Sequence, residues 1–159
     1  MISKAIVDQL KKKGVPIYVD SKPERYDLFD EVYLLKPNLR QAMMALGIQR
    51  DELRVEEIAL NLSKKYNSNI FLTLGDQGSL IHELDSEKSN LIQIFDKKKL
   101  KDVSGAGDTA LSAFVLASLE KDLVFSAEFA NICSGMVVSK SGTSSTSLDE
   151  IEVELTNGK

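Results

Sequence analysis

Apolar residues along this chain alternate between the spacing typical of helices and the short runs typical of buried strands. Helical spacing predicts helices at residues 2–13, 39–46, 55–66, about 107–120 and 122–139, with a short helix after Leu148. Apolar runs predict strands at residues 17–19, 32–35, 69–74, 79–83 and 91–95. Strands and helices alternate early, and a small antiparallel group follows. This order predicts an α/β fold with a largely parallel sheet.

Turn-forming residues support these boundaries. Pro37 and Asn38 come directly before a helical pattern that ends at Gly47, which predicts a capped helix between them. Gly75 and Gly78 lie between two predicted strands and indicate a tight turn. The length of 159 residues predicts one domain, and no internal repeat is present.

Composition excludes several classes of protein. The chain has 159 residues, 43% of them hydrophobic, a formal charge of −4 and a pI of about 5.1, which argues against nucleic-acid binding. It has no apolar run of membrane-spanning length and no signal-peptide pattern, so it is predicted to be cytoplasmic with no membrane contact. Cys133 and His82 are the only residues of their types, which argues against a zinc site. We expect His82 on a strand surface and Cys133 buried in a helix, and predict no side-chain metal cluster.

The most informative segment is D-V-S-G-A-G-D-T at residues 102–109, which stands directly before a predicted helix. Small residues at Gly105, Ala106 and Gly107 allow the backbone N–H groups to converge at the helix N-terminus, where they can hold a phosphate. Asp108 follows at once and could accept the proton of a hydroxyl that attacks this phosphate. The segment therefore indicates phosphoryl transfer.

The same segment also fits other interpretations. Gly105, Gly107 and Ala110 also match the dinucleotide fingerprint G-x-G-x-x-G/A, but a lysine-rich stretch precedes them instead of an apolar strand. A Walker A loop is excluded, because no G-K-[ST] follows the glycines. A glycine-rich loop that only begins a helix, with Asp108 as a helix cap, stays open from the residues alone.

Four blocks in one order resemble the ribokinase-like (PfkB-type) sugar kinases. Residues 102–108 match the family signature D-T-x-G-A-G-D, with Val103 in place of the first threonine. The other blocks are T-L-G-D-Q-G at 73–78, P-N-L-R-Q at 37–41, and the helix and loop at 130–144. Within the family, the V-D-S-K run at 19–22 and the blocks at 102–109 and 130–144 resemble D-glycero-β-D-manno-heptose-7-phosphate kinases, the kinase part of bifunctional ADP-heptose synthases.

The resemblance implies a three-layer α/β sheet flanked by helices, with ATP and Mg²⁺ as cofactors and a sugar or sugar phosphate as substrate. It implies that Asp108 is the catalytic base and that Gly105, Ala106 and Gly107 hold the transferred phosphoryl group. Asp102 would order this loop, with a monovalent cation beside it. The nucleotide would be bound by Thr73, Gly75 and Gly78 at its phosphates, by Asn38 at the metal and phosphate, and by Asn131, Gly142 and Ser144 at its adenine and ribose. From the residues alone, Asn38 can equally be a helix cap, the 73–78 block a plain hairpin, and the last three residues packing and loop positions.

Two departures from the family pattern matter. Gln41 stands where the family has a glutamate that helps to organise the magnesium ion, so metal handling is in doubt. The family's N-terminal half and its lid are absent, so residues 1–159 are expected to be the nucleotide-binding and catalytic C-terminal part of a kinase domain. A separate N-terminal-half chain or a homo-oligomer could complete it, and by itself the chain is expected to be inactive. A non-catalytic nucleotide-binding module, or another PfkB-type kinase, is the alternative.

Overall fold

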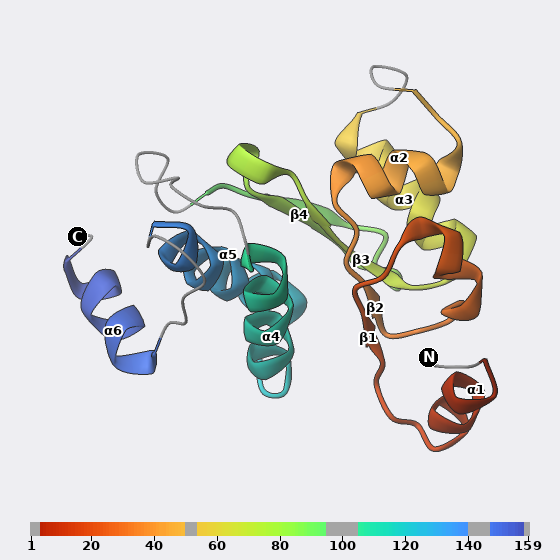
Figure 1. Cartoon of the computed structure of the whole chain (residues 1–159), viewed down its shortest axis with the longest axis horizontal. Helices are drawn as coiled ribbons and strands as arrows, with labels where there is room; N and C mark the ends of the chain where they lie inside the picture. The colour runs from red at the N-terminus through yellow and green to blue at the C-terminus, as the bar shows by residue number, and fades with distance from the viewer. Residues whose placement is uncertain (1–3, 50–53, 95–104, 140–146, 158–159) are drawn as a thin grey trace. The chain divides into compact units, whose positions relative to one another are not determined.

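The computed structural model describes residues 4–49, 54–94, 105–139 and 147–157 (Figure 1). The chain divides into two compact units. The first comprises Met1–Gly75 and Ser79–Leu91, and the second comprises Asp76–Gly78 and Ile92–Lys159.

A five-stranded sheet organises the first unit. Its strands are β1 (Tyr18–Val19), β2 (Leu34–Leu35), β3 (Asn69–Thr73), β4 (Ser79–His82) and β5 (Ser89–Ile92), in the order β1-β2-β3-β4-β5. The first three strands are parallel, and β4 runs antiparallel to β3. The mixed α/β sheet predicted from the sequence is confirmed, although β5 begins two residues before the predicted strand at 91–95.

The helices of this unit are α1 (Lys4–Lys12), the 3₁₀ helix η1 (Pro23–Leu28), α2 (Leu39–Leu46) and α3 (Val55–Tyr66). Figure 1 shows α2 and α3 beside each other, and both contact the β3–β4 region. The predicted start and end of α2 are confirmed, since Asn38 is its N-cap and Gly47 ends it with φ 68°. The sequence did not predict η1.

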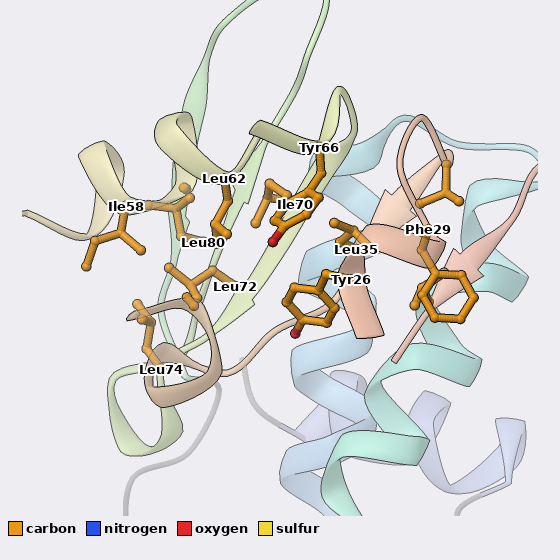
Figure 2. Close-up of a cluster of buried hydrophobic side chains, with 14 of the residues drawn as sticks. Tyr26, Phe29, Leu35, Ile58, Leu62, Tyr66, Ile70, Leu72, Leu74 and Leu80 are labelled. Carbon is orange, nitrogen blue, oxygen red and sulfur yellow. The ribbon is translucent and has the colours of Figure 1, made fainter. Parts of the chain in front are cut away.

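Aromatic and aliphatic side chains fill the space between these helices and the sheet (Figure 2). Leu62, Ile70 and Leu72 are fully buried there, and the rings of Tyr26 and Tyr66 meet edge to face, with centroids 5.6 Å apart. Burial of such side chains removes apolar area from water and is the main force that holds the helices on the sheet. The core therefore fixes β2 and β3, the strands that carry two of the candidate blocks.

The predicted position of His82 is wrong, because this residue is buried and not on the strand surface. All four residues of β4 are buried, so the strand has no solvent-facing side. His82 Nδ1 lies 2.8 Å from Ser89 Oγ, which supplies a hydrogen-bond partner inside the protein. Burial lowers the pKa of His82, and the imidazole is therefore held neutral at physiological pH.

Helices make up most of the second unit: α4 (Ala106–Ser118), α5 (Leu123–Ser139) and α6 (Leu148–Asn157). Both long helices lie close to their predicted positions and pack along each other. Ala110 on α4 and Ala127 and Ala130 on α5 are buried. Cys133 is buried in α5, as predicted. Within the part of the chain that the structure describes, no helix is long and apolar enough to cross a membrane.

Candidate functional site

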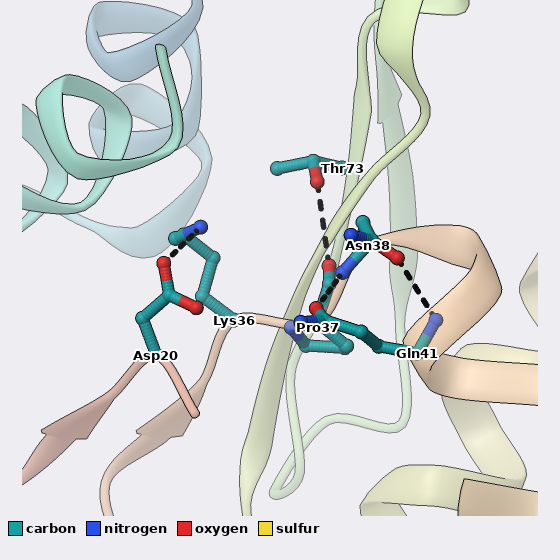
Figure 3. A network of polar contacts seen from close by, with 6 residues as sticks. All are labelled: Asp20, Lys36, Pro37, Asn38, Gln41 and Thr73. Atoms are coloured by element: carbon teal, nitrogen blue, oxygen red, sulfur yellow. Dashed lines mark hydrogen bonds and ion pairs between the residues drawn. The ribbon is translucent and has the colours of Figure 1, made fainter. Parts of the chain in front are cut away.

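The carboxyl ends of β1, β2 and β3 lie at one edge of the sheet, because the three strands are parallel and adjacent. Asp20 follows β1, Lys36 to Asn38 follow β2, and Thr73 ends β3 (Figure 3). Open α/β sheets bind their ligands outside the carboxyl ends of the strands. Two of the predicted nucleotide-binding residues, Asn38 and Thr73, are thus at the edge where such a site is expected.

Main-chain pairing continues beyond β2 and β3 and joins these two residues. Asn38 and Thr73 form an isolated parallel bridge, and Thr73 N donates to Pro37 O at 3.0 Å. The Thr73 hydroxyl also donates to Pro37 O at 3.5 Å, a long hydrogen bond (Figure 3). The backbone therefore sets the separation of the P-N block and the T-x-G block.

The Asn38 side chain caps α2. Its Oδ1 accepts from Gln41 N at 2.8 Å, and Gln41 Oε1 accepts from Asn38 N at 2.9 Å. This reciprocal pair is a capping box, in which glutamine serves as well as glutamate because each bond needs only a side-chain oxygen acceptor. Gln41 thus has a structural function here, and the cap interpretation of Asn38 is supported.

Gly75 and Gly78 adopt backbone conformations that favour glycine. Gly75 begins the 3₁₀ turn η2 (Gly75–Gln77) with φ 66°, and Gly78 has φ 93°. A Cβ at Gly78 would overlap the carbonyl oxygen of Ile92, so close packing between two chain segments also requires glycine there. This contact accounts for Gly78 structurally, and its predicted role at the nucleotide stays a prediction.

Gly105 to Asp108 form the start of α4, as the sequence predicts. Gly105 is the N-cap with φ 81°, and Thr109 N donates to Gly105 O at 3.0 Å, which closes the first helical turn. The amide groups of Ala106, Gly107 and Asp108 precede that bond, and the first amides of a helix have no acceptor within the helix. Asp108 is exposed in this first turn. The geometry suits a negatively charged ligand.

Asn131 lies in α5 and is 9% exposed. Its Nδ2 donates to Ile92 O at 3.3 Å and to Gln93 O at 3.4 Å. These bonds tie α5 to the end of β5, so a packing function for Asn131 is supported, while adenine contact stays a prediction. Asp102, Gly142 and Ser144 lie outside the described residues. Among the residues that are described, no group of three or more His, Cys, Asp or Glu side chains could hold a metal ion.

An ion pair between a buried lysine and a partly exposed aspartate at this edge of the sheet was missed by the sequence analysis. Lys36 Nζ lies 2.6 Å from Asp20 Oδ2, with 5% of the Lys36 side chain and 30% of the Asp20 side chain exposed (Figure 3). The available signal was positional: an aspartate directly after one predicted strand and a lysine directly after the next. Lysine clusters in the sequence suggested solvent exposure, and this lysine is the opposite case.

Comparison with known proteins assigns the family. Residues 3–151 match the family model described as pfkB family carbohydrate kinase. The chain belongs to this family. The pfkB assignment agrees with the motif order found in the sequence and covers both units of the structure.

Among curated relatives of this pfkB chain is the bifunctional protein HldE of Sulfurimonas denitrificans, 35% identical over 156 residues. That match covers 95% of the chain and 31% of the relative. Bifunctional protein HldE of Nitratiruptor sp. is 32% identical over 146 residues, covering 90% of the chain and 30% of the relative. The chain therefore spans less than a third of the length of these relatives.

Solved structures confirm a ribokinase-like fold. Ribokinase of Arabidopsis thaliana, described as complexed with ribose and ATP, superposes with a TM-score of 0.82 at 24% identity, covering 96% of this chain and 51% of the ribokinase. Phosphofructokinase-2 of Escherichia coli, in complex with potassium, gives a TM-score of 0.81 at 21% identity, covering 98% of this chain and 51% of the other. At these identities the likeness establishes the fold.

Proposed function

We propose that this chain is the nucleotide-binding and catalytic part of an ATP-dependent sugar kinase, and that its substrate is D-glycero-β-D-manno-heptose 7-phosphate. The family assignment supports a carbohydrate kinase, and relatives named HldE at 35% and 32% identity support the heptose substrate. The observation that carries the proposal is the glycine-capped start of α4, with Asp108 exposed in its first turn.

Asp108 would act as the general base. It would take the proton from the sugar hydroxyl while the amide groups of Gly105, Ala106 and Gly107 stabilise the charge on the transferred phosphoryl group. Phosphoryl transfer needs little covalent chemistry from the protein, so positioning and charge stabilisation provide most of the rate. The Asp108 carboxylate and the backbone N–H donors at the start of α4 would supply both the positioning and the charge stabilisation.

The remaining predicted residues would bind the nucleotide. Thr73, Gly75 and Gly78 would contact its phosphates, and Asn131, Gly142 and Ser144 would line the adenine and ribose. Mg²⁺ would neutralise charge on the phosphates, and the exposed amide oxygen of Asn38 is a hard ligand of the kind this ion accepts beside its waters. A monovalent cation beside Asp102 belongs to the same proposal, as does a further polypeptide segment or a second copy that completes the sugar pocket.

A non-catalytic nucleotide-binding module is the second candidate, and Gln41 favours it. The Gln41 side chain cannot ionise, whereas the carbohydrate kinases that this chain resembles have a glutamate at this position. A chain with this function would bind nucleotide without transferring its phosphate.

Calorimetry with ADP and a kinase assay distinguish the two candidates. We expect the 159-residue chain to bind ADP weakly and to phosphorylate little or no sugar alone, because a water-excluding lid is part of catalysis in such enzymes. Combined with the rest of a kinase domain, it should phosphorylate heptose 7-phosphate with a higher kcat/KM than ribose or fructose 6-phosphate. Absence of ADP binding would contradict both candidates. Strong turnover by the chain alone would contradict the need for a completing segment.

A further inference from the structure

Figure 1 shows the turn that joins α4 to α5 in the second unit, and this turn borders an apolar hollow of about 360 Å³. Its apolar lining includes Leu116, Leu119, Phe125 and Phe129. Leu116, Leu119 and Phe125 are 57%, 69% and 45% exposed. A single exposed apolar side chain is ordinary, whereas three large ones around one hollow indicate a surface that makes contact with a partner.

Two opposite charges, Glu120 and Lys121, also line this hollow. Their backbone N–H groups both donate to Ala117 O, at 3.2 Å and 3.0 Å. The Asp122 carboxylate accepts from Phe125 N at 2.8 Å, so the backbone of the turn is held in place on both sides. Neither Glu120 nor Lys121 has an ion-pair partner among the described residues, and both are exposed. The apolar lining and these two charges together form the corner surface.

The charges of the corner surface are complementary to those of a second copy of this chain. In a two-fold dimer, a contact of one residue with another is repeated with the two residues exchanged. A two-fold axis beside Glu120 and Lys121 would therefore pair each glutamate with the lysine of the other copy, while the apolar side chains cover one another. An anionic membrane fits less well, because Lys121 stands between two acids, Glu120 and Asp122, and anionic lipid attracts clusters of basic residues.

We propose that the corner surface is a two-fold contact through which two copies of this chain associate. The contact lies at the end of α4 away from Asp108. Asp108 and Ser118 are about 15 Å apart along the helix axis, at a rise of 1.5 Å per residue. The contact therefore does not involve the start of α4. The proposal goes beyond the proposed function and does not depend on it, because it concerns association of the chain and not its chemistry.

Sedimentation equilibrium of the full 159-residue chain tests the contact. The parent should dimerise with a Kd between about 1 μM and 1 mM, since the corner surface is smaller than a standard interface of roughly 20–30 residues a side. Leu119→Gln should weaken dimerisation about tenfold or more, because a polar amide would be buried in the apolar contact. Leu91→Gln is the matched control, since Leu91 on β5 is 54% exposed and lies outside the corner surface. A parent that stays monomeric at about 1 mM, or a Leu119→Gln variant with parental affinity, would overturn the proposal.

Charge reversal at Glu120 and Lys121 tests the two-fold pairing. Glu120→Lys and Lys121→Glu should each weaken dimerisation about tenfold or more, because like charges then meet across the axis. An equal mixture of the two variants should form a heterodimer with near-parental affinity, since every glutamate again faces a lysine. Native mass spectrometry with one variant labelled with ¹⁵N measures the heterodimer. A mixture that dimerises no better than the separate variants would show that the two charges do not face each other, and the proposal would fail.

Circular dichroism and ADP calorimetry separate this contact from folding and from nucleotide binding. Glu120→Lys and Lys121→Glu change exposed side chains on a turn, so both variants should fold like the parent and bind ADP with parental affinity. Dimerisation that Leu119→Gln and both charge reversals leave unchanged belongs to another surface and contradicts the proposal. Absence of ADP binding, with the expected pattern of dimerisation among the variants, would contradict the proposed kinase function and leave the two-fold contact standing.

Discussion

Helices α2 and α4 begin in opposite ways. At α2, the side-chain oxygens of Asn38 and Gln41 each accept a hydrogen bond from the backbone N–H of the other residue. This capping box supplies acceptors for two backbone N–H groups at the helix start. At α4, the N-cap is Gly105, which has no side chain to offer, and the acid in the first turn is Asp108. A start closed by side chains serves the fold, whereas a start without a capping side chain leaves its amides available to a ligand. The comparison favours α4 as the phosphate-binding end.

The largest expected effect is on catalysis by the α4 start. In an assembly that turns over, Asp108→Asn should lower kcat by about 10²–10⁴, because the amide keeps the shape but accepts no proton. Affinity for ATP should change little. Asp149→Asn is a matched control, since Asp149 is also an exposed acid in the first turn of a helix, α6. If both variants keep parental turnover, Asp108 is only an acid in the first turn of α4, and the comparison fails at its main point.

A smaller effect is expected from the Gly105 backbone. Gly105→Ala should lower the free energy of unfolding by about 1–2 kcal/mol, because a residue with a Cβ is strained in the left-handed region. Gly47→Ala should cost a similar amount, since Gly47 at the end of α2 has φ 68° against 81° at Gly105, and neither added Cβ meets a described atom within 4 Å. Urea unfolding measures both. Only Gly105→Ala should also weaken ADP binding, and equal ADP affinities would remove the distinction between the two helix ends.

The smallest effect is expected at the α2 start. Gln41→Glu should keep the capping box and raise stability at pH 7 by about 0.3–1 kcal/mol, because a negative charge is favourable at a helix N-terminus. The same interaction lowers the folded-state pKa of the introduced carboxyl. The gain is therefore present above the unfolded pKa of about 4.3 and is lost as the pH falls through the folded value.

Thermal unfolding of the parent and of Gln41→Glu at pH 7 and pH 3 measures this difference. Gln41→Ala, which removes one of the two reciprocal bonds, should be less stable than the parent at both pH values. A destabilised Gln41→Glu at pH 7 would show that the box does not hold in solution.

Local signals made the helix boundaries predictable. Asn38 and Gly47 delimit α2 because capping depends on residues within four positions of each helix end, and these positions can be read directly from the sequence. The start of α4 at the glycine-rich segment was predictable for the same reason. The parallel strands followed from short apolar runs separated by helices.

Features that depend on distant residues were not predictable. Burial of His82 follows from the covering of both faces of β4, and its partner Ser89 lies on the next strand. The pairing of Lys36 with Asp20 requires β1 and β2 to be adjacent and parallel, which the sequence suggests only as a class of fold. Residue type alone assigns the side chains of His82 and Lys36 to solvent, whereas both are buried. The structure brings together Asn38 and Thr73 at one sheet edge. Contact of these two and of the other predicted residues with a nucleotide stays a prediction.

The bridge between Asn38 and Thr73 determines which kinds of sequence change this edge can tolerate. The bond from Thr73 N to Pro37 O belongs to the main chain, so a substitution at either residue leaves the two blocks at the same separation. Insertion or deletion of one residue in β3 would instead turn every following side chain to the opposite face of the sheet. Among related chains, this junction should therefore vary in side chains while keeping its length.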